Sequence, residues 1–520
     1  MKKSFILFSI FFCTVLYSQV VHQIYFDRFS HYSSDDWVTY APALDITSID
    51  VGEDYIFFGT RNGGILRYNV YDKYWDYPYT SSNGLQSNKI YRIVYEFSDN
   101  RWYAQTSKGI DELNKAFKYW QPSSKKVLPQ QRSPEEYQVD DYRQNPNYNF
   151  PQFYRPDNSE LPDFFTDRQY LFRPPDEILD EENRIFHFNN DRVVDNWRNL
   201  WLTTDGLGPA KANLNEQTLK FYQKSISNIQ PRDLYFDGNK VWIGGISEFK
   251  EPAGINFWNL DKDTWKYYEA RYNYNLQNDN CFAITGNKEY IFCGTEQGVC
   301  RYDKKEKEWN TLTTINGLES NKINDLIIWK NSLVIATDEG FNFMLPDART
   351  AQESKNTTLD NVPVFKISAT DSLLYFATRE GIYQYELSND DLQFVNTGSA
   401  ILDLYISAVN IQTDTIWAAG EYGIIFYDPA GDRWQSFTNI RQAVFGTIYD
   451  INFSGNNIWF ATDDGLLKYD KKRDYWYLYT EKDGLADRHV YSVTVDADDL
   501  WLCTKAGLTL FRWYRGSRTE

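Results

Sequence analysis

The 520-residue chain is poor in the residues from which catalytic and metal sites are usually built. It has only four His and five Cys, and no His lies in a HExxH pattern or pairs recognisably with a nucleophile. Carboxylate pairs such as Asp463-Asp464 are adjacent in predicted turns, which gives them no opposed geometry for acid/base catalysis. Walker and dinucleotide-binding loops are missing as well. We therefore predict no catalytic residue, no metal site and no cofactor, and we favour a protein that is not an enzyme.

Cysteine is also too scarce for a disulfide scaffold in a chain of this length. Four cysteines would remain after removal of a leader: Cys281, Cys293, Cys300 and Cys503. Cys293 and Cys300 flank a predicted tight turn, so the sequence leaves open a cross-strand bridge or two small buried thiols.

Long apolar runs are missing after the first residues. Two lysines precede an apolar run over residues 5–17 and then Ser18, which is the layout of a secretory signal peptide. We predict a signal peptide over residues 1–18, cleaved near Ser18, and an exported mature chain that is periplasmic, at the cell surface or secreted. A lipoprotein signal at Cys13 is the alternative, although the bulky Phe12 precedes it. No later segment reaches 18 apolar residues, so we predict no transmembrane segment in the mature chain.

Positive charge is in short supply. The formal net charge is −18, and it becomes −20 when the two N-terminal lysines are removed. Such a surface repels phosphate backbones, so we predict no nucleic-acid partner. Aromatic residues, by contrast, make up 18% of the chain, which suits strands and large buried surfaces.

One pattern is repeated along the chain. Residues 458–476 read IWFATDDGLLKYDKKRDYW, and residues 416–434 and 291–309 read similarly. Alignment on the Ala/Gly-Thr step gives ten anchors, which are 41 or 42 residues apart from Thr337 onward: Thr60, Thr106, Thr204, Gly245, Thr295, Thr337, Thr378, Gly420, Thr462 and Thr504. A constant period of about 42 residues built from short strands is typical of propeller blades.

Each full unit has four predicted strands separated by turns. In the last complete copy we expect strands at 448–453, 458–462, 466–469 and 476–479. The second strand is apolar on both faces, which predicts that neighbouring sheets cover both.

The two ends of the chain favour closure of a ring. The last copy stops after its third strand, at 507–512, while residues 36–40 (DWVTY) match a fourth strand that has no sheet of its own. Pairing these segments would remove exposed edges, and an unpaired tail is the alternative. We predict an all-β fold over residues 19–520, a β-propeller of four-stranded antiparallel blades in one ring of about ten blades. Two smaller propellers are the alternative.

Proline is concentrated in one segment that breaks the period. Nine of the 17 prolines lie between Trp120 and Ile185, interspersed with aromatic residues. Because proline suppresses regular ladders, we predict a Pro- and aromatic-rich insertion over residues 121–185 that packs on the propeller.

Polar residues follow the repeat anchors. In an up-and-down blade, the turns between the second and third strands lie on the same side as the connections between blades. This face is expected to collect the segments at 83–90, 316–323 and 483–490 and the following candidate ligand-binding residues: Arg61, Asn62, Glu296, Gln297, Asp338, Glu339, Arg379, Glu380, Glu421, Tyr422, Asp463 and Asp464. They predict a mostly acidic rim for hydroxyl-rich or cationic ligands, or else they stabilise the turns themselves.

The repeat resembles the two-component regulator propeller repeat. The likeness is strongest at Asn316-Gly317-Leu318, Ala461-Thr462, Gly465 and Tyr469-Asp470, and it covers nearly all of residues 30–515 outside 121–185. In that family such repeats form the extracytoplasmic sensing part of hybrid sensor kinases, often in polysaccharide-responsive systems. The resemblance implies a propeller with a sensor-like binding role, and we expect neither a kinase part nor a transmembrane part in this chain.

We therefore expect an exported, non-catalytic, sensor-like propeller that recognises a glycan or another envelope protein through the face described above. Two alternatives stay open: a polysaccharide-active lyase or hydrolase with this fold, and a structural component of an envelope or secretion assembly. A catalytic residue would stand out among the repeats, and Arg379 and Tyr422 are weak examples of such outliers.

Overall fold

The computed structural model describes residues 32–514 except 117, 130–160, 167–168, 196–198, 248–253, 353–357, 389, 399–402 and 438–445. In this part of the chain the regular structure is strand apart from four single 3-10 turns: η1 (Ser34–Asp36), η2 (Ser81–Asn83), η3 (Ala270–Tyr272) and η4 (Thr314–Asn316). The strands form ten sheets. The predicted all-β propeller fold is confirmed.

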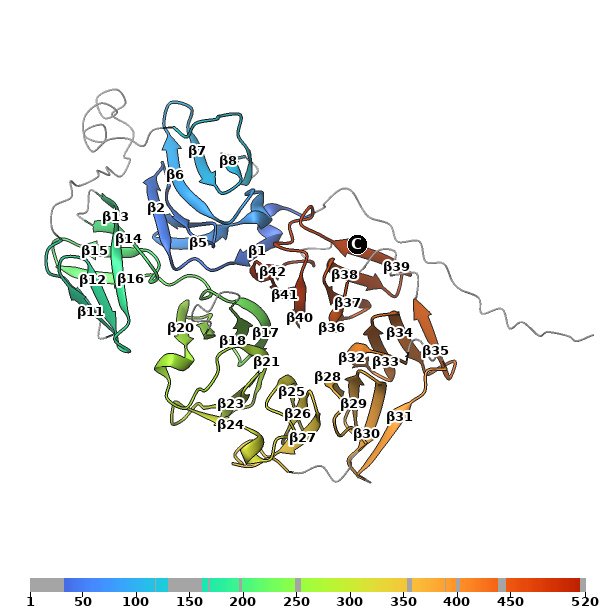
Figure 1. Ribbon diagram of the computed structural model, residues 1–520. Helices are drawn as coiled ribbons and strands as arrows, with labels where there is room; N and C mark the ends of the chain where they lie inside the picture. Colours follow the sequence, from blue (N-terminus) through green and yellow to red (C-terminus); the bar gives the residue numbers. More distant parts are fainter. Residues whose placement is uncertain are drawn as a thin grey trace, which may run out of the picture.

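Seven sheets stand around a common axis, each contributing one innermost strand (Figure 1). We call these sheets the ring. In chain order they contain β17 (Gln230–Phe236), β18 (Lys240–Ile246), β19 (Ile255–Asn259) and β20 (Thr264–Tyr268); β21 (Cys281–Gly286), β22 (Tyr290–Thr295), β23 (Gly298–Asp303) and β24 (Glu308–Leu312); β25 (Ile323–Trp329), β26 (Ser332–Thr337) and β27 (Gly340–Met344); β28 (Val364–Ala369), β29 (Leu373–Thr378), β30 (Gly381–Glu386) and β31 (Asp391–Val395); β32 (Ile406–Gln412), β33 (Thr415–Gly420), β34 (Gly423–Asp428) and β35 (Arg433–Phe437); β36 (Ile448–Ser454), β37 (Asn457–Thr462), β38 (Gly465–Asp470) and β39 (Tyr475–Tyr479); and β40 (Val490–Asp496), β41 (Asp499–Thr504) and β42 (Gly507–Phe511).

The ring closes through the N-terminal strand. β1 (Trp37–Tyr40) pairs antiparallel with β42, in a register that places Trp37 opposite Phe511 and Tyr40 opposite Leu508. β1 is therefore the fourth strand of the last blade, as the sequence predicted. The first and last blades of the ring then pack together, with Leu234 of β17 and Trp501 of β41 in one buried cluster.

The remaining three sheets lie outside the ring (Figure 1). We call them the lateral arc. They contain β2 (Ile46–Val51), β3 (Tyr55–Thr60), β4 (Ile65–Asn69) and β5 (Tyr74–Tyr79); β6 (Ile90–Glu96), β7 (Arg101–Thr106), β8 (Gly109–Asn114) and β9 (Tyr119–Pro122); and β10 (Phe165–Thr166), β11 (Tyr170–Arg173), β12 (Glu177–Asp180), β13 (Ile185–Val194), β14 (Asn199–Thr204), β15 (Ala210–Asn213) and β16 (Thr218–Phe221). The expected ring of about ten blades is thus corrected to a ring of seven with three further blade-like sheets beside it.

The arc stays open because its two end sheets do not need a further neighbour. β2 packs between β6 and β13. On the outward face of the sheet β6 to β9, Arg92 and Gln105 are exposed, and Gln105 stands at a position where ring blades carry small apolar residues such as Ala461 and Cys503. At the other end, Phe164 and Phe172 from the predicted insertion pack into the core of the seven-stranded sheet. Polar or covered outer faces let a stack of sheets end without exposing apolar surface.

The repeated Thr and Gly of the sequence form one turn. In five ring blades the Thr hydroxyl at the end of the second strand donates to the carbonyl oxygen of the Gly three residues on, at 2.8 to 3.0 Å, in the pairs Thr295/Gly298, Thr337/Gly340, Thr378/Gly381, Thr462/Gly465 and Thr504/Gly507. The φ angles of these glycines lie between 114° and 143°, a region that other residues avoid. The turn explains why both residues recur.

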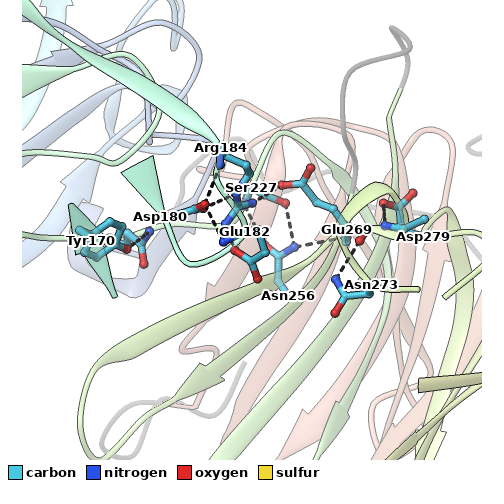
Figure 2. Close-up of polar contacts among 12 residues, drawn as sticks. Tyr170, Asp180, Glu182, Arg184, Ser227, Asn256, Glu269, Asn273 and Asp279 are labelled. Atoms are coloured by element: carbon cyan, nitrogen blue, oxygen red, sulfur yellow. Dashed lines mark hydrogen bonds and ion pairs between the residues drawn. The ribbon is translucent and has the colours of Figure 1, made fainter. Parts of the chain in front are cut away.

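The lateral arc is fastened to the ring by polar contacts at two places. Near β1, the hydroxyls of Thr39 and Ser82 lie 2.8 Å apart. Near β20, the guanidinium of Arg184 contacts Asp180 and Glu182 of its own hairpin and donates to Glu269 at 2.5 Å (Figure 2). The arc is thus held to the first and last blades of the ring.

The four cysteines in the described residues are free and buried. Cys293 and Cys300 lie directly opposite each other on β22 and β23, and both are fully buried. Of the two interpretations left open, the structure therefore shows buried thiols.

Candidate functional site

The innermost strand of every ring blade begins with the same β-bulge. In each blade one residue has no partner in the pairing register with the second strand, and we call these seven residues the bulge layer: Arg232, Phe282, Asn324, Phe365, Ser407, Tyr449 and Tyr491. All seven are half-buried. A β-bulge turns a side chain out of the regular alternation, so the ring presents one such side chain per blade at the mouth of its axis.

Neighbouring members of the bulge layer touch one another. The guanidinium of Arg232 stacks 3.5 Å from the ring centroid of Tyr491, whose ring lies 5.6 Å from that of Tyr449. The Tyr449 hydroxyl in turn donates to Asp463 at 2.7 Å. Three consecutive blades, on β36, β40 and β17, therefore share one continuous aromatic and cationic surface.

On the other side of the mouth, bulge-layer side chains hydrogen-bond to the backbone of the next blade in the chain. Asn324 donates from its amide to Asp338 and to the carbonyl oxygen of Val364, both at 2.9 Å. The Ser407 hydroxyl donates to the carbonyl oxygen of Ile448 at 2.6 Å. These contacts fix the mouth side chains before any ligand arrives.

A second layer lies directly after each bulge. We call it the carboxylate layer, and it consists of Asp233, Ala283, Asp325, Lys366, Ala408, Asp450 and Ser492. Each of its three aspartates accepts a backbone N–H of the following blade, from Ile284 at 2.9 Å, Ile367 at 2.8 Å and Val493 at 3.1 Å. The carboxylates therefore join one blade to the next.

Lys366 bridges carboxylates across the axis. Its Nζ lies 3.3 Å from Asp325 and 3.7 Å from Asp450, which belong to different blades. Burial disfavours its charged form, but Asp325, Asp450 and Asp233 outweigh this and raise the pKa of Lys366. Burial is the main cause that raises the pKa of Asp233 to about 7, and the like charges of Asp325 and Asp450 add to the rise. The opposite charge of Lys366 offsets only part of it. One cation therefore serves three carboxylates.

The layers together form a preorganised, polar and aromatic mouth with negative charge beneath it. Charge-complementary binding of a cationic or hydroxyl-bearing group suits such a surface. The part of the chain that the structure describes contains no group of three or more His, Cys, Asp or Glu placed to hold a metal ion. Nor does any helix in the described ranges have the length and hydrophobicity of a membrane span.

The candidate residues named from the sequence divide between the two parts of the fold. Arg61 and Asn62 follow β3 in the lateral arc, and the guanidinium of Arg61 pairs with Asp45. The other ten follow the second strand of five ring blades: Glu296, Gln297, Asp338, Glu339, Arg379, Glu380, Glu421, Tyr422, Asp463 and Asp464. All are exposed or half-buried.

Two of these ten hydrogen-bond to the bulge layer. Asp463 accepts from Tyr449, and Asp338 accepts from Asn324. Others serve the turn, since the backbone N–H groups of Glu339, Glu380 and Asp464 each donate to the preceding anchor Thr at 3.1 Å. The twelve residues therefore rim the mouth in part and stabilise turns in part.

Sequence analysis missed the bulge layer and the carboxylate layer. A signal for both exists in the aligned repeats, in segments such as INDL, VFKI, IYDI and VYSV at the start of the first strand. Apolar residues flank two positions that change chemistry from copy to copy. Variation between constant apolar neighbours marks positions that do not build the common core.

No family model matches the chain, and no curated protein matches it. Several solved structures do. The extracellular domain of the hybrid two-component system BT4673 from B. thetaiotaomicron is 14% identical, with 90% of this chain and 70% of that chain covered and a TM-score of 0.44. The corresponding domain of BT3049 from the same organism is 17% identical, with 90% and 68% covered and a TM-score of 0.46.

A third solved structure matches a smaller part of this chain. The structure described as YCF48 bound to D1 peptide is 13% identical, with 54% of this chain and 93% of that chain covered and a TM-score of 0.43. The propeller fold itself rests on the pairing registers and the ring closure of this chain.

Proposed function

We propose that the protein is an exported, non-catalytic binding propeller that recognises a segment of another envelope protein at the mouth of the ring. The observation that carries the proposal is the bulge layer, in which seven blades each contribute one half-buried side chain. Export is supported by the signal-peptide layout of residues 1–18.

The composition of the mouth favours a protein partner. Phe282, Phe365, Tyr449 and Tyr491 share the bulge layer with Arg232 and two small polar residues, and aromatic residues and Arg are the types that are enriched in protein interfaces. The contacts of Tyr491 with Arg232 and with Tyr449 limit the side-chain entropy that binding would cost. The acidic turns around the mouth support a partner segment that carries basic residues.

A glycan is the second candidate. The Tyr rings could stack against a sugar, and Asn324, Asp338 and Asp463 provide hydrogen-bonding groups beside them. The resemblance to sensor propellers implies this ligand class as well. The two candidate ligands are therefore a protein segment and a glycan, and one experiment distinguishes them.

The experiment places a photo-crosslinking amino acid at Phe365 in the full chain and exposes it to envelope extract. The matched control carries the crosslinker at Asn456, an exposed residue between β36 and β37 at the opposite end of the blade. We expect a discrete protein adduct from position 365 only, and its loss when Arg232→Ala and Tyr491→Ala are added. Equal adducts from both positions, or none from 365, would refute a protein partner. Binding on a glycan array that Arg232→Ala abolishes would then favour the glycan, and turnover of that glycan would favour the enzyme.

A further inference from the structure

A groove of about 730 Å³ lies between the ring sheets β28 to β31 and β32 to β35. One end of the groove is formed by the turns at 370–372 and 413–414, which join the first and second strands of the two blades. These turns lie at the opposite end of the blades from the bulge layer. The groove is therefore separate from the mouth.

The groove exists because this interface lacks the aromatic stack of the next one. In the following blade, Trp417 stacks with Phe426 at 4.6 Å and with Phe437 at 6.2 Å between ring centroids. The strand registers place Tyr375, Gln384 and Val395 at the three corresponding positions of the groove blade. Smaller and more polar side chains leave the space open.

One wall of the groove is a tryptophan that the ring elsewhere buries. Trp434 corresponds by register to Trp265, Trp309 and Trp476, which are 7%, 5% and 1% exposed. Trp434 itself is half-buried and lines the groove beside Tyr427, whose ring lies 5.6 Å away. Two aromatic rings are thus available to a ligand.

Two polar side chains that line the groove, Gln384 and Tyr375, are unpaired within the described part of the chain. At the position of Gln384, Arg301 donates to the carbonyl oxygens of Pro346 and Ala348, and Lys468 lies 4.7 Å from the ring of Tyr477. Within the described residues, no hydrogen bond is made by the amide of Gln384.

The hydroxyl of Tyr375 is in the same situation, since among the residues described it makes no hydrogen bond. The Tyr375 side chain is only 6% exposed and lines the groove. The Tyr375 hydroxyl and the Gln384 amide both face the groove, so they are free to hydrogen-bond with a ligand there.

We propose that this groove binds a neutral saccharide of one or two rings. The faces of Trp434 and Tyr427 suit the C–H faces of a sugar, while Gln384 and the Tyr375 hydroxyl supply both donors and acceptors for its hydroxyls. Asp371 and Asp414 lie at the rim, and Lys and Arg are absent from the described lining, so an anionic ligand is disfavoured. The volume falls within the usual range for small-molecule sites, about 300–1,000 Å³.

The test titrates glucose, galactose, cellobiose and maltose into the full chain and follows tryptophan fluorescence and heat. We expect saturable binding of at least one sugar, weakened at least tenfold by Gln384→Ala and by Trp434→Ala. Gln393→Ala, at an exposed position on neighbouring β31, is the matched control and should bind as the wild type does.

A variant that fills the groove separates loss of sugar binding from loss of protein stability. Gln384→Phe with Val395→Phe restores the residue types of the next interface, so it should abolish binding while the melting temperature stays equal or rises. If these substitutions unfold the chain, Gln384→Leu replaces them. The proposal is overturned if none of the four sugars binds at tens of millimolar, if the filled variant still binds, or if choline binds and the sugars do not. Arg232→Ala should leave sugar binding unchanged, so failure at the mouth and failure at the groove are distinguishable.

Discussion

The indole of Trp37 lies parallel to the ring of Phe511, with the centroids 3.7 Å apart and the planes 7° apart. Both side chains are at most 1% exposed. This contact joins the N-terminal strand to the last blade and so closes the ring.

Replacing Trp37 by Ala should destabilise the ring, because a large buried side chain is lost where the two ends meet. We expect the free energy of unfolding to fall by about 3–5 kcal/mol, measured by urea denaturation. Tyr71→Ala is the control, since Tyr71 is 47% exposed. Equal effects of the two substitutions would contradict closure through β1.

Asp233→Asn should change the pH dependence of stability. The pKa of Asp233 is about 7 in the folded chain and about 3.9 for an unfolded Asp. The folded chain therefore binds this proton more tightly, so the contribution of Asp233 to stability falls as pH rises from about 4 to 7 and is constant above that.

An Asn at position 233 still offers an oxygen to the N–H of Ile284 but carries no charge. We expect the variant to be more stable than the wild type above pH 7, by about 1–3 kcal/mol, with the difference shrinking toward pH 4. The measurement is urea unfolding of both proteins between pH 4.5 and 8.5. A difference that does not grow with pH would show that Asp233 does not hold its proton in the folded chain.

Lys366→Met should be costly, because it leaves three neighbouring carboxylates without their shared cation. Removing one partner of a buried ion pair lowers the free energy of unfolding by about 3–5 kcal/mol. We expect the loss to be larger at pH 8 than at pH 5, where protonation can relieve the repulsion. Lys240→Met, on the exposed end of β18, is the control. Partial rescue by adding Asp325→Asn would identify charge as the cause, and an equal loss at both pH values would argue for packing instead.

Arg184→Ala should loosen the lateral arc without unfolding the ring. The guanidinium is the cation among Asp180, Glu182 and Glu269, so its removal leaves like charges facing one another across the junction. Amide hydrogen exchange should accelerate in the turn between β12 and β13 and in η3, while β36 to β39 stay protected. Arg173→Ala, exposed on β11 of the same sheet, is the control. Unchanged exchange at the junction would mean that apolar packing alone fixes the arc.

The sequence predicted the blade well because its strands and turns depend on local chemistry. The strands expected at 448–453, 458–462, 466–469 and 476–479 are β36 to β39 to within one residue at each end. The period comes from the Thr and Gly turn, and the fourth strand of the last blade was recognisable from its pattern at 36–40. Such features need only neighbours in the chain.

The number of blades in the ring could not be counted from the anchors, since arc sheets and ring sheets carry the same repeat. The difference lies in what covers their faces. β7 reads RWYAQT, with exposed Arg101 and Gln105, whereas β37 reads NIWFAT and is almost wholly buried. The polar residues of β7 were visible in the sequence as a sign of an end sheet.

The candidate site was predicted in outline only. Turn residues such as Asp338 and Asp463 were named, but the side chains that they contact, Asn324 and Tyr449, were not. A β-bulge depends on pairing between strands, which a single strand's alternation does not reveal. The groove beside Gln384 depends on a comparison between two blade interfaces and could be seen only once the registers were known.

Because β1 pairs with β42, the two edges that seal the ring are separated by almost the whole length of the chain. Pairings of such long sequence separation are slow to form, since the loop between them must be ordered first. The lateral arc and six ring blades can assemble from neighbouring hairpins as they are synthesised. We expect sealing to be the last and slowest step of folding, with the edges of β1 and β42 left unpaired until it occurs.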